Sequence, residues 1–217
     1  MGRGNYMKIE TPKIPTELPS KNFHDILYEE DLELEMCQIQ HSIFNDEVLN
    51  KVRLSKMVLK NCKFINTDFS GIEMTDVAFE NCDFSNAKMN ISSIHKCTFR
   101  NCKLLGVDFT DSRFGNVQFM DSLLNLAAFG SSKLEKVQFQ DSSIESSDYY
   151  DCIFKKVEFK ACMMDGANFE RTSLNGVDIS TSTFQSLVVS PSDLRGCKVS
   201  TYQAIQFSAL LGLEIID

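Results

Sequence analysis

Large apolar residues recur at every fifth position over most of this 217-residue chain. The segment 107–119, VDFTDSRFGNVQF, states the pattern, with a small or compact residue two positions before each of three apolar residues, Phe109, Phe114 and Phe119. The same phase runs without an insertion from Leu34 to Val199, and every Phe except Phe23 and Phe207 lies in it. A period of five fits neither an α-helix nor an ordinary alternating strand, so it predicts a repeat architecture.

The uninterrupted register predicts one elongated solenoid over residues 34–199. Residues 1–33 hold three of the four prolines and an acidic patch, which predicts a loose lead-in followed by a cap. Both Met1 and Met7 are consistent with the native start. Since no charged-then-apolar leader and no apolar run of membrane-spanning length occurs, we expect a cytoplasmic protein.

The eight cysteines share one phase, two residues before a central apolar position. They are Cys37, Cys62, Cys82, Cys97, Cys102, Cys152, Cys162 and Cys197. A free Cys behaves as a small hydrophobe, so this phase predicts buried, reduced thiols in a narrow inward slot. A spacing of twenty would also stack Cys62, Cys82 and Cys102 at about 4.8 Å, within reach of a disulfide, although a reducing compartment favours free thiols.

Catalytic motifs are missing from the sequence. No Ser, Cys or carboxylate stands at a motif spacing from His24, His41 or His95, and no glycine-rich phosphate loop or Cys/His ligand cluster occurs. We therefore predict that the protein is not an enzyme, with no catalytic residue, no metal site and no cofactor.

A column of basic residues and a tyrosine in the Phe phase are both explained by structure and not by function. Lys60, Arg100 and Lys160 fall in one column, but Glu80 and Gln140 stand between them and no exposed aromatic residues accompany them, so we expect a solvated face and no direct contact with nucleic acid. Tyr149 places a hydroxyl in the Phe phase, where it needs a partner or must reach the surface.

The repeats CDFSN (82–86), VDFTD (107–111), ANFER (167–171) and LNGVDIS (174–180) resemble those of the pentapeptide-repeat family. That resemblance implies an all-β solenoid, a right-handed quadrilateral β-helix with four fives in each coil and a C-terminal helix cap. On this geometry, positions twenty apart share a face.

The end of the chain, residues 200–217, is predicted to close the solenoid. Ser200 and Gln203 have the spacing of a capping box, which predicts a helix over 201–211 closed by Gly212, and a strand follows at 213–215.

The ending DLRGCKVSTYQAIQFSALLGLEI resembles the C-terminal module of Qnr-type members of the family. The resemblance rests on Leu194, Gly196, Val199, Gln203, Ala204, Leu211 and Gly212. It implies a homodimer joined through this module, with an interface of Ala204, Ile205, Phe207, Leu210, Leu211, Leu213 and Ile215. It also implies a rod that mimics duplex DNA, binds bacterial DNA gyrase or topoisomerase IV and confers quinolone resistance, a form of antibiotic resistance.

The charge has the sign that a DNA mimic needs, since the net charge is −8. Aspartates repeating at the coil period predict a partner-binding surface of Asp68, Asp108, Asp111, Asp121, Asp141, Asp148, Asp151 and Glu170, with Asp121 and Asp141 on the corner next to the others. Two alternatives stay open: these aspartates are ordinary solvated residues, and the protein is a scaffold or adaptor for another protein partner.

Overall fold

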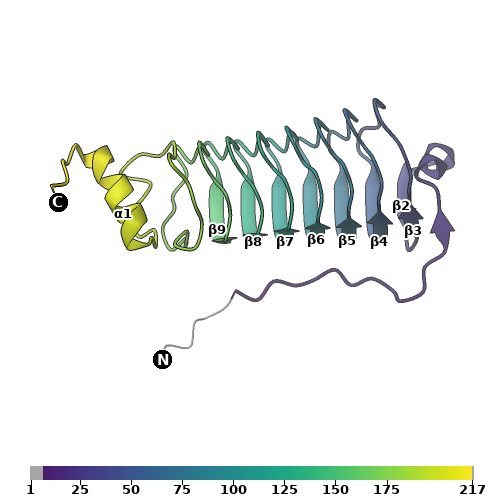
Figure 1. The fold of residues 1–217 in the computed structure, drawn as a ribbon. Helices are drawn as coiled ribbons and strands as arrows, with labels where there is room; N and C mark the ends of the chain where they lie inside the picture. The colour runs from purple at the N-terminus through teal and green to yellow at the C-terminus, as the bar shows by residue number, and fades with distance from the viewer. Residues whose placement is uncertain (1–6, 217) are drawn as a thin grey trace.

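The computed structural model of the protein describes residues 7–216, so Met1 lies outside the described residues. The chain is an all-parallel β-solenoid with short helical segments near its two ends (Figure 1). The elements are β1 (Ser20–Lys21), η1 (Phe23–Tyr28), β2 (Glu33–Glu35), β3 (Gln38–Gln40), β4 (Arg53–Lys60), β5 (Glu73–Glu80), β6 (Ser93–Arg100), β7 (Arg113–Met120), β8 (Lys133–Gln140), β9 (Ile153–Lys160), α1 (Thr201–Ser208) and η2 (Ala209–Leu211).

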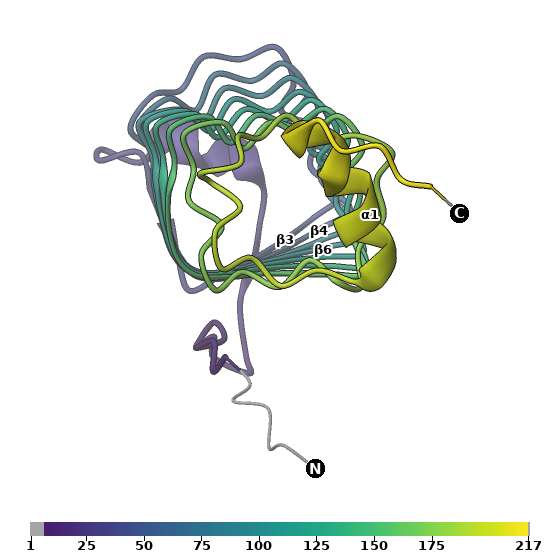
Figure 2. The same cartoon turned by 90° about the vertical axis from the view of Figure 1, so that its left-hand side faces the viewer.

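Each coil takes twenty residues and has four faces (Figure 2). In the coil 112–131, the first to fourth faces are residues 112–116, 117–121, 122–126 and 127–131, and the fifth residue of each is its corner. Strand β7 crosses the first and second faces, whereas the third and fourth pair with the next coil through single bridges such as Ala128↔Asp148. The prediction of four five-residue repeats in each coil is therefore confirmed.

The corners turn through the left-handed backbone region. Asn116, Asp121 and Leu126 have φ of 57°, 52° and 61°. Asn and Asp tolerate this conformation better than other residues with a side chain, which explains their frequency at the fifth position. Ile91 is a less suitable corner residue, with φ of 57° and a side chain that is 68% exposed.

The central apolar residues stack inside the rod as parallel columns. Phe119 lies 5.0 Å from both Phe99 and Phe139 between ring centroids, with interplanar angles of 14° and 10°. Adjacent columns meet edge to face, as Phe129 does against Phe139. Offset or stacked rings and T-shaped pairs are both favourable, so the coil period fixes the ring geometry of the core.

The small slots hold the cysteines as free thiols. Seven of them are buried, and the prediction for Cys197 is wrong because the last coils are less covered and leave it half-buried. Burial raises the pKa of Cys97 to about 12, with desolvation as the largest cause. The structure thus favours packing over redox chemistry for these residues.

Tyr149 follows neither of the two expectations for its hydroxyl. The residue is 0% exposed, and the hydroxyl has no hydrogen-bond partner among residues 7–216. Its ring stacks between Phe129 and Phe169, at centroid distances of 4.9 and 5.0 Å. The Tyr149 ring therefore packs in the Phe column, while its hydroxyl oxygen is left without a hydrogen bond.

The N-terminal end of the solenoid is covered by η1. Phe23 is 1% exposed and packs edge-on against Phe44 and Phe64, at 4.9 and 4.7 Å between centroids. A capping box of Asn22 and Asp25 begins this segment. Residues 7–19, which we call the strap, run back along the rod instead of forming the loose lead-in that the sequence suggested (Figure 1).

The C-terminal end is covered by α1. The predicted capping box is present, with Ser200 as the N-cap and Gln203 as its partner, and Gly212 closes η2 with φ of 69°. The buried Gln203 amide donates to the carbonyl oxygens of Ile179 and Ser182 at 2.9 and 2.8 Å, which satisfies acceptors at the open end of the coil. The predicted strand at 213–215 is not formed, since a strand needs a neighbour and this segment pairs with none within the described chain.

Candidate functional site

The predicted acidic column lies on the fourth face. Backbone bridges join Asp68, Lys88, Asp108, Ala128 and Asp148 in one line. The aspartates are therefore forty residues apart and not twenty, so a lysine or an alanine separates them. The column is less dense in charge than a run of aspartates in successive coils would be.

Asp68 is locally neutralised. Its carboxylate lies 3.7 Å from the Lys88 ammonium. The hydrogen bond from Ser70, followed by the charge of Lys88, lowers the pKa of Asp68 against the opposing effect of its burial. The part of the fourth face with excess negative charge thus begins at Asp108.

From residue 107 to residue 171, the fourth face and its corner carry acids with a single base, Arg171. We call these acids the acidic ridge: Asp108, Asp111, Asp148, Asp151 and Glu170. Asp111, Asp151 and Glu170 are exposed, whereas Asp108 and Asp148 are half-buried at the base of the ridge. Arg171 lies over the Tyr150 ring at 5.6 Å, near Glu170.

Asp121 and Asp141 do not belong to the acidic ridge, and the prediction that placed them on the next corner is wrong. They occupy the corner after the second face, whereas Asp111 and Asp151 occupy the corner after the fourth. Ten residues are half of a twenty-residue coil, so the two pairs lie on opposite corners of the rod. Asp121 instead faces Arg100, with 3.4 Å between carboxylate and guanidinium.

The half-buried aspartates also have a local structural role that the sequence analysis missed. Asp108 Oδ1 accepts hydrogen bonds from the backbone N–H and the hydroxyl of Thr110, at 3.0 and 2.8 Å. Asp83 and Asp178 make the same pair of bonds to Ser85 and Ser180. An Asp followed two positions later by Ser or Thr is the sequence signal for this turn.

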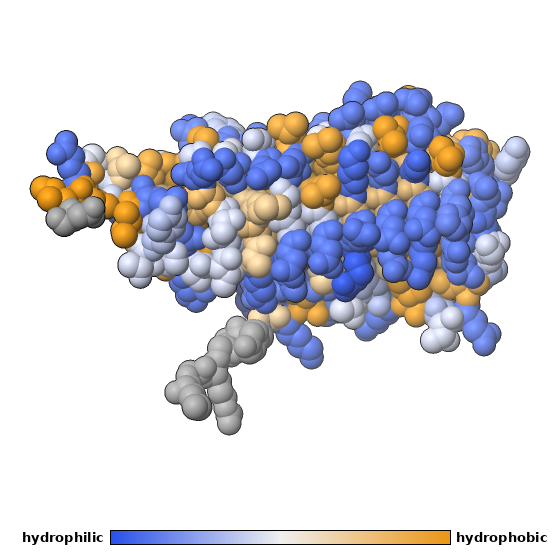
Figure 3. Space-filling model, in the orientation of Figure 1, coloured by the Kyte–Doolittle hydropathy of each residue, from blue (hydrophilic) through white to orange (hydrophobic). Residues whose placement is uncertain are grey.

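The predicted dimer interface is mostly uncovered. Ala204, Ile205, Leu210, Leu211, Leu213 and Ile215 are exposed and form what we call the terminal apolar surface. Phe207 differs, since it is half-buried and packs on Phe184 at 5.3 Å between ring centroids. Phe207 is therefore part of the cap, and its substitution would disturb the solenoid end as well as any contact made there. The space-filling view shows apolar residues at this end of the rod (Figure 3).

Within residues 7–216, no group of three His, Cys, Asp or Glu side chains is arranged to hold a metal ion. His24 contacts the Asn22 side chain at 3.0 Å, and the His95 ring packs against Gly115, where a Cβ would lie 2.7 Å from the ring. Of the helices in the described part of the chain, none is long and apolar enough to cross a membrane.

Comparisons with known proteins agree with this architecture. A family model described as a pentapeptide repeat region matches residues 72–148 and 92–169, and a model of eight pentapeptide repeats matches residues 53–90. The uncharacterized protein YisX of Bacillus subtilis (strain 168) is 32% identical over 73 residues, which are 34% of this chain and 34% of that protein. The match thus spans about a third of the length of this curated relative.

Solved structures with a similar fold include HetL, a pentapeptide repeat protein involved in heterocyst differentiation regulation from the cyanobacterium Nostoc sp. strain PCC 7120. It aligns with a TM-score of 0.56 and 14% identity over 82% of this chain and 88% of that one. Full-length QnrB1, a plasmid-mediated fluoroquinolone resistance protein, aligns with a TM-score of 0.49 and 17% identity over 81% of this chain and 100% of that one.

The two family models together span residues 53–169, or 117 of 217 residues. Their matches fall on the regular coils, where the period of five, the left-handed corners and the stacked core are all present. The chain belongs to the pentapeptide-repeat family.

Proposed function

We propose that the protein is a homodimeric DNA mimic that binds a bacterial type II topoisomerase, gyrase or topoisomerase IV, and protects it from quinolones. The observation that carries the proposal is the acidic ridge, in a chain whose C-terminal residues resemble those of Qnr-type proteins. The ridge supplies the contact with the enzyme, and the terminal apolar surface joins two rods. The protein acts by binding and not by catalysis, in the cytoplasm where these enzymes work.

The charge distribution supports a contact of this kind. Between residues 107 and 171, the fourth face and its corner carry the five carboxylates of the acidic ridge against Arg171 alone. Asp108 and Asp148 are two coils apart, or about 10 Å at the usual strand spacing. Regularly spaced carboxylates on a rigid rod attract a cationic surface shaped to receive duplex DNA. The attraction should weaken as salt screens the charges.

The terminal apolar surface supports the dimer. Leu211 is 65% exposed and Leu213 is 59% exposed, while Ile216 at the end of the described chain is 91% exposed. Leu211 and Leu213 line a shallow groove of about 310 Å³ that also contains Val199 and Phe207. An apolar patch at one end of a rod is covered when a second copy meets it across a two-fold axis. A partner copy would also supply the neighbour that residues 213–215 need to form a strand.

The test of the acidic ridge uses Asp108→Asn with Asp148→Asn. Asn retains the acceptor that holds the local turn, as Asn168 does in the same column through its bond from the Glu170 N–H at 3.0 Å. The charge is removed while the turn is preserved. We expect binding to gyrase, measured by surface plasmon resonance at low salt, to weaken about tenfold or more.

The matched control is Asp121→Asn with Asp141→Asn, which removes the same charge from the opposite corner. Asn already occupies that corner in earlier coils, where Asn101 donates to Asn81 at 2.7 Å, so the change suits the column. The control pair should bind gyrase nearly as well as the wild type. Equal losses in both pairs would show that only the overall charge matters and would contradict the proposed ridge.

The dimer is tested separately with Leu211→Asp and Ile215→Asp. Light scattering should give a dimer mass for the wild type and a monomer mass for these variants, while circular dichroism stays unchanged because neither side chain enters the core. Leu123→Asp is the control, since Leu123 is also an exposed leucine but lies on the third face, far along the rod. A wild-type chain that is monomeric at micromolar concentration would exclude the dimer.

A second function, a scaffold for another protein partner, is favoured by the turn bonds of the aspartates. Asp108 and Asp178 have a structural reason to be there without any partner. HetL, which has a similar fold, is described as involved in heterocyst differentiation regulation. A chain that binds no type II topoisomerase at low salt would support the scaffold in place of the DNA mimic.

A further inference from the structure

The strap runs along the rod (Figure 1), and its hydrogen bonds to Asp76 and Asn116 place it at the corner between the first and second faces. Its residues alternate between half-buried and exposed over most of residues 7–14, as expected for an extended chain that lies on a surface. The corner beneath it is formed by the column Asp76, Lys96, Asn116, Lys136 and Lys156. This column is on the opposite edge of the first face from the corner that carries Asp111 and Asp151.

The contacts show that the strap lies along the rod axis. The Lys13 N–H donates to Asp76 at 2.9 Å, and the Glu10 N–H donates to Asn116 at 3.1 Å. Three residues of extended chain cover about 10 Å, and the two coils from Asp76 to Asn116 also cover about 10 Å. Corner side chains two coils apart therefore bind backbone groups three residues apart in the extended strap, so the strap and the coils are in register.

An acidic side chain of the strap is also held by this column. The Glu10 carboxylate lies 2.9 Å from the Lys96 ammonium. This ion pair lowers the pKa of Glu10, mainly through the hydrogen bond and then the charge of Lys96. The column thus receives both the backbone and a carboxylate of the segment that lies on it.

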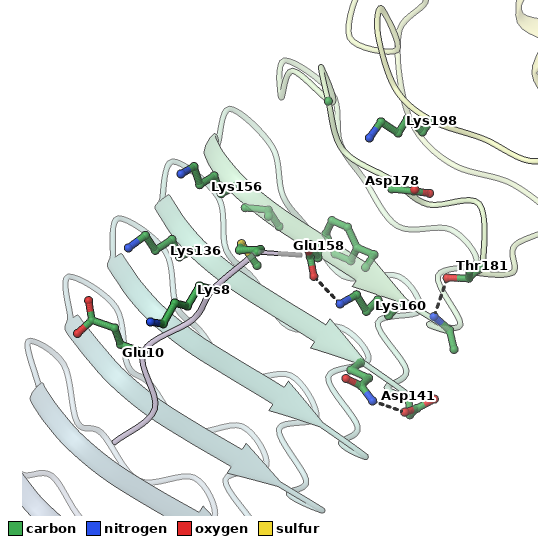
Figure 4. A pocket seen from close by; sticks show the side chains of 16 residues that line it. Lys8, Glu10, Lys136, Asp141, Lys156, Glu158, Lys160, Asp178, Thr181 and Lys198 are labelled. Carbon is green, nitrogen blue, oxygen red and sulfur yellow. Dashed lines mark hydrogen bonds and ion pairs between the residues drawn. The ribbon is translucent and has the colours of Figure 1, made fainter. Parts of the chain in front are cut away.

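The N-terminal end of the strap borders an open groove of about 1180 Å³, and Met7, Lys8 and Glu10 line it together with residues of β8, β9 and the coil after them (Figure 4). Lys136 and Lys156 are the next corner residues after Asn116. Neither lies within ion-pair distance of an acid in residues 7–216, although the charge of Lys136 contributes to lowering the pKa of Glu10 and of Glu135. Lys8 and Lys198 also line the groove. In Figure 4, Lys8, Lys136 and Lys156 lie along one side of it.

The acids of the groove are already engaged. The Glu158 carboxylate accepts from Gln138 at 3.0 Å and lies 2.7 Å from the Lys160 ammonium. Asp178 accepts from the backbone and the hydroxyl of Ser180. Four lysines of the groove therefore form no ion pair among residues 7–216: Lys8, Lys136, Lys156 and Lys198.

We propose that this groove binds an acidic, extended peptide segment of a partner protein, which lies beside the N-terminal end of the strap and runs in the same direction along the rod. A peptide fits better than a nucleic acid for two reasons. The strap is itself a peptide bound along the same rod. The lining also mixes lysines with the carboxylates of Asp141, Glu158 and Asp178, which suits a peptide with separated carboxylates better than a backbone with a phosphate at every nucleotide. The site is independent of the acidic ridge and of the topoisomerase proposal.

The experiment measures fluorescence anisotropy of a labelled peptide of about eight residues that alternates Glu and Val, a length of about 25 Å when extended. The wild-type chain should bind this peptide in low salt and should not bind the matched peptide with Lys in place of Glu. Lys136→Glu with Lys156→Glu should weaken binding about tenfold or more, and the milder pair Lys136→Gln with Lys156→Gln should give a smaller loss.

The control variant is Lys51→Glu with Lys63→Glu, which makes the same charge change at exposed lysines on other parts of the rod. This control should keep most of the affinity. Equal losses in groove and control variants, or no binding by the wild type, would overturn the proposal. Tighter binding of a duplex oligonucleotide that is lost in the same groove variants would overturn it as well, because the site would then be one for nucleic acid.

Discussion

Replacing Tyr149 by Phe should stabilise the protein. The Tyr149 side chain is fully buried, and its hydroxyl finds no hydrogen-bond partner within the described residues. The ring lies between Phe129 and Phe169 in one column, so a Phe ring is already accommodated in the coils before and after it. Burial raises the pKa of Tyr149 well above its usual value, with desolvation as the largest cause, which is consistent with the apolar surroundings.

The expected magnitude follows from two opposing effects. Removing an unsatisfied buried hydroxyl should return about 1–3 kcal/mol of desolvation free energy. The void left by one oxygen, about 15 Å³, should cost about 0.4 kcal/mol at about 24 cal/mol per Å³. We therefore expect the free energy of unfolding to rise by about 1–2 kcal/mol, and the melting temperature by about 2–4 °C for each kcal/mol in a chain of this size.

The assay is urea denaturation followed by circular dichroism, with calorimetry for the melting temperature. Tyr150→Phe is the control, because Tyr150 is only half-buried and its change should stay within about 0.5 kcal/mol. A Tyr149→Phe variant that is less stable than the wild type would instead show that the Tyr149 hydroxyl has a hydrogen-bond partner inside the rod.

Three further changes test the slots, the corners and the pH dependence. Raising the pH from 8 to 10 should lower the free energy of unfolding, because buried thiols keep their protons in the folded state and lose them in the unfolded state. The variant Cys97→Val, which copies Val77 and Val117 in the same column, should reduce this loss of stability by about 1 kcal/mol, measured by urea titrations at both pH values. Ile91→Asn should stabilise by about 1 kcal/mol, measured by the urea midpoint, because Asn tolerates the left-handed corner. Cys102→Phe should destabilise by about 1–3 kcal/mol in the same assay, through overpacking of a buried slot.

The regular coils could be predicted because every five-residue repeat must meet the same physical requirements. Each repeat needs an inward Phe or Leu, a small buried residue two positions before it, and a corner residue that tolerates the left-handed backbone. These requirements lie within five residues, so the sequence period identifies them without knowledge of distant contacts. The capping box at Ser200 and Gln203 was predictable for the same reason.

The course of the strap was not predictable in this way. Residues 7–19 have no period of five, and their position depends on Asp76 and Asn116, which are 63 and 106 residues away from their strap partners. A strand at 213–215 likewise depends on a neighbour that the single chain does not offer. The course of the strap is set by tertiary contacts, and a strand at 213–215 would need a neighbouring strand; local sequence patterns encode neither.

Part of the candidate site could be predicted from the sequence. The fourth-face column of Asp108 and Asp148 follows from the twenty-residue coil, and so does the opposite placement of Asp121, which is ten residues, or half a coil, from Asp111. The neutralisation of Asp68 is different, because it requires the Lys88 side chain to turn toward it.

The proposed protection of gyrase can be tested in a DNA supercoiling assay with the bacterial enzyme at a fixed, inhibitory quinolone concentration, titrated with this protein. Supercoiling should recover as the wild-type protein is added, and the variant Asp108→Asn with Asp148→Asn should require a much higher concentration for the same recovery. If folded wild-type protein restores no supercoiling at any concentration and does not bind the enzyme at low salt, the protein is not a DNA mimic that protects gyrase.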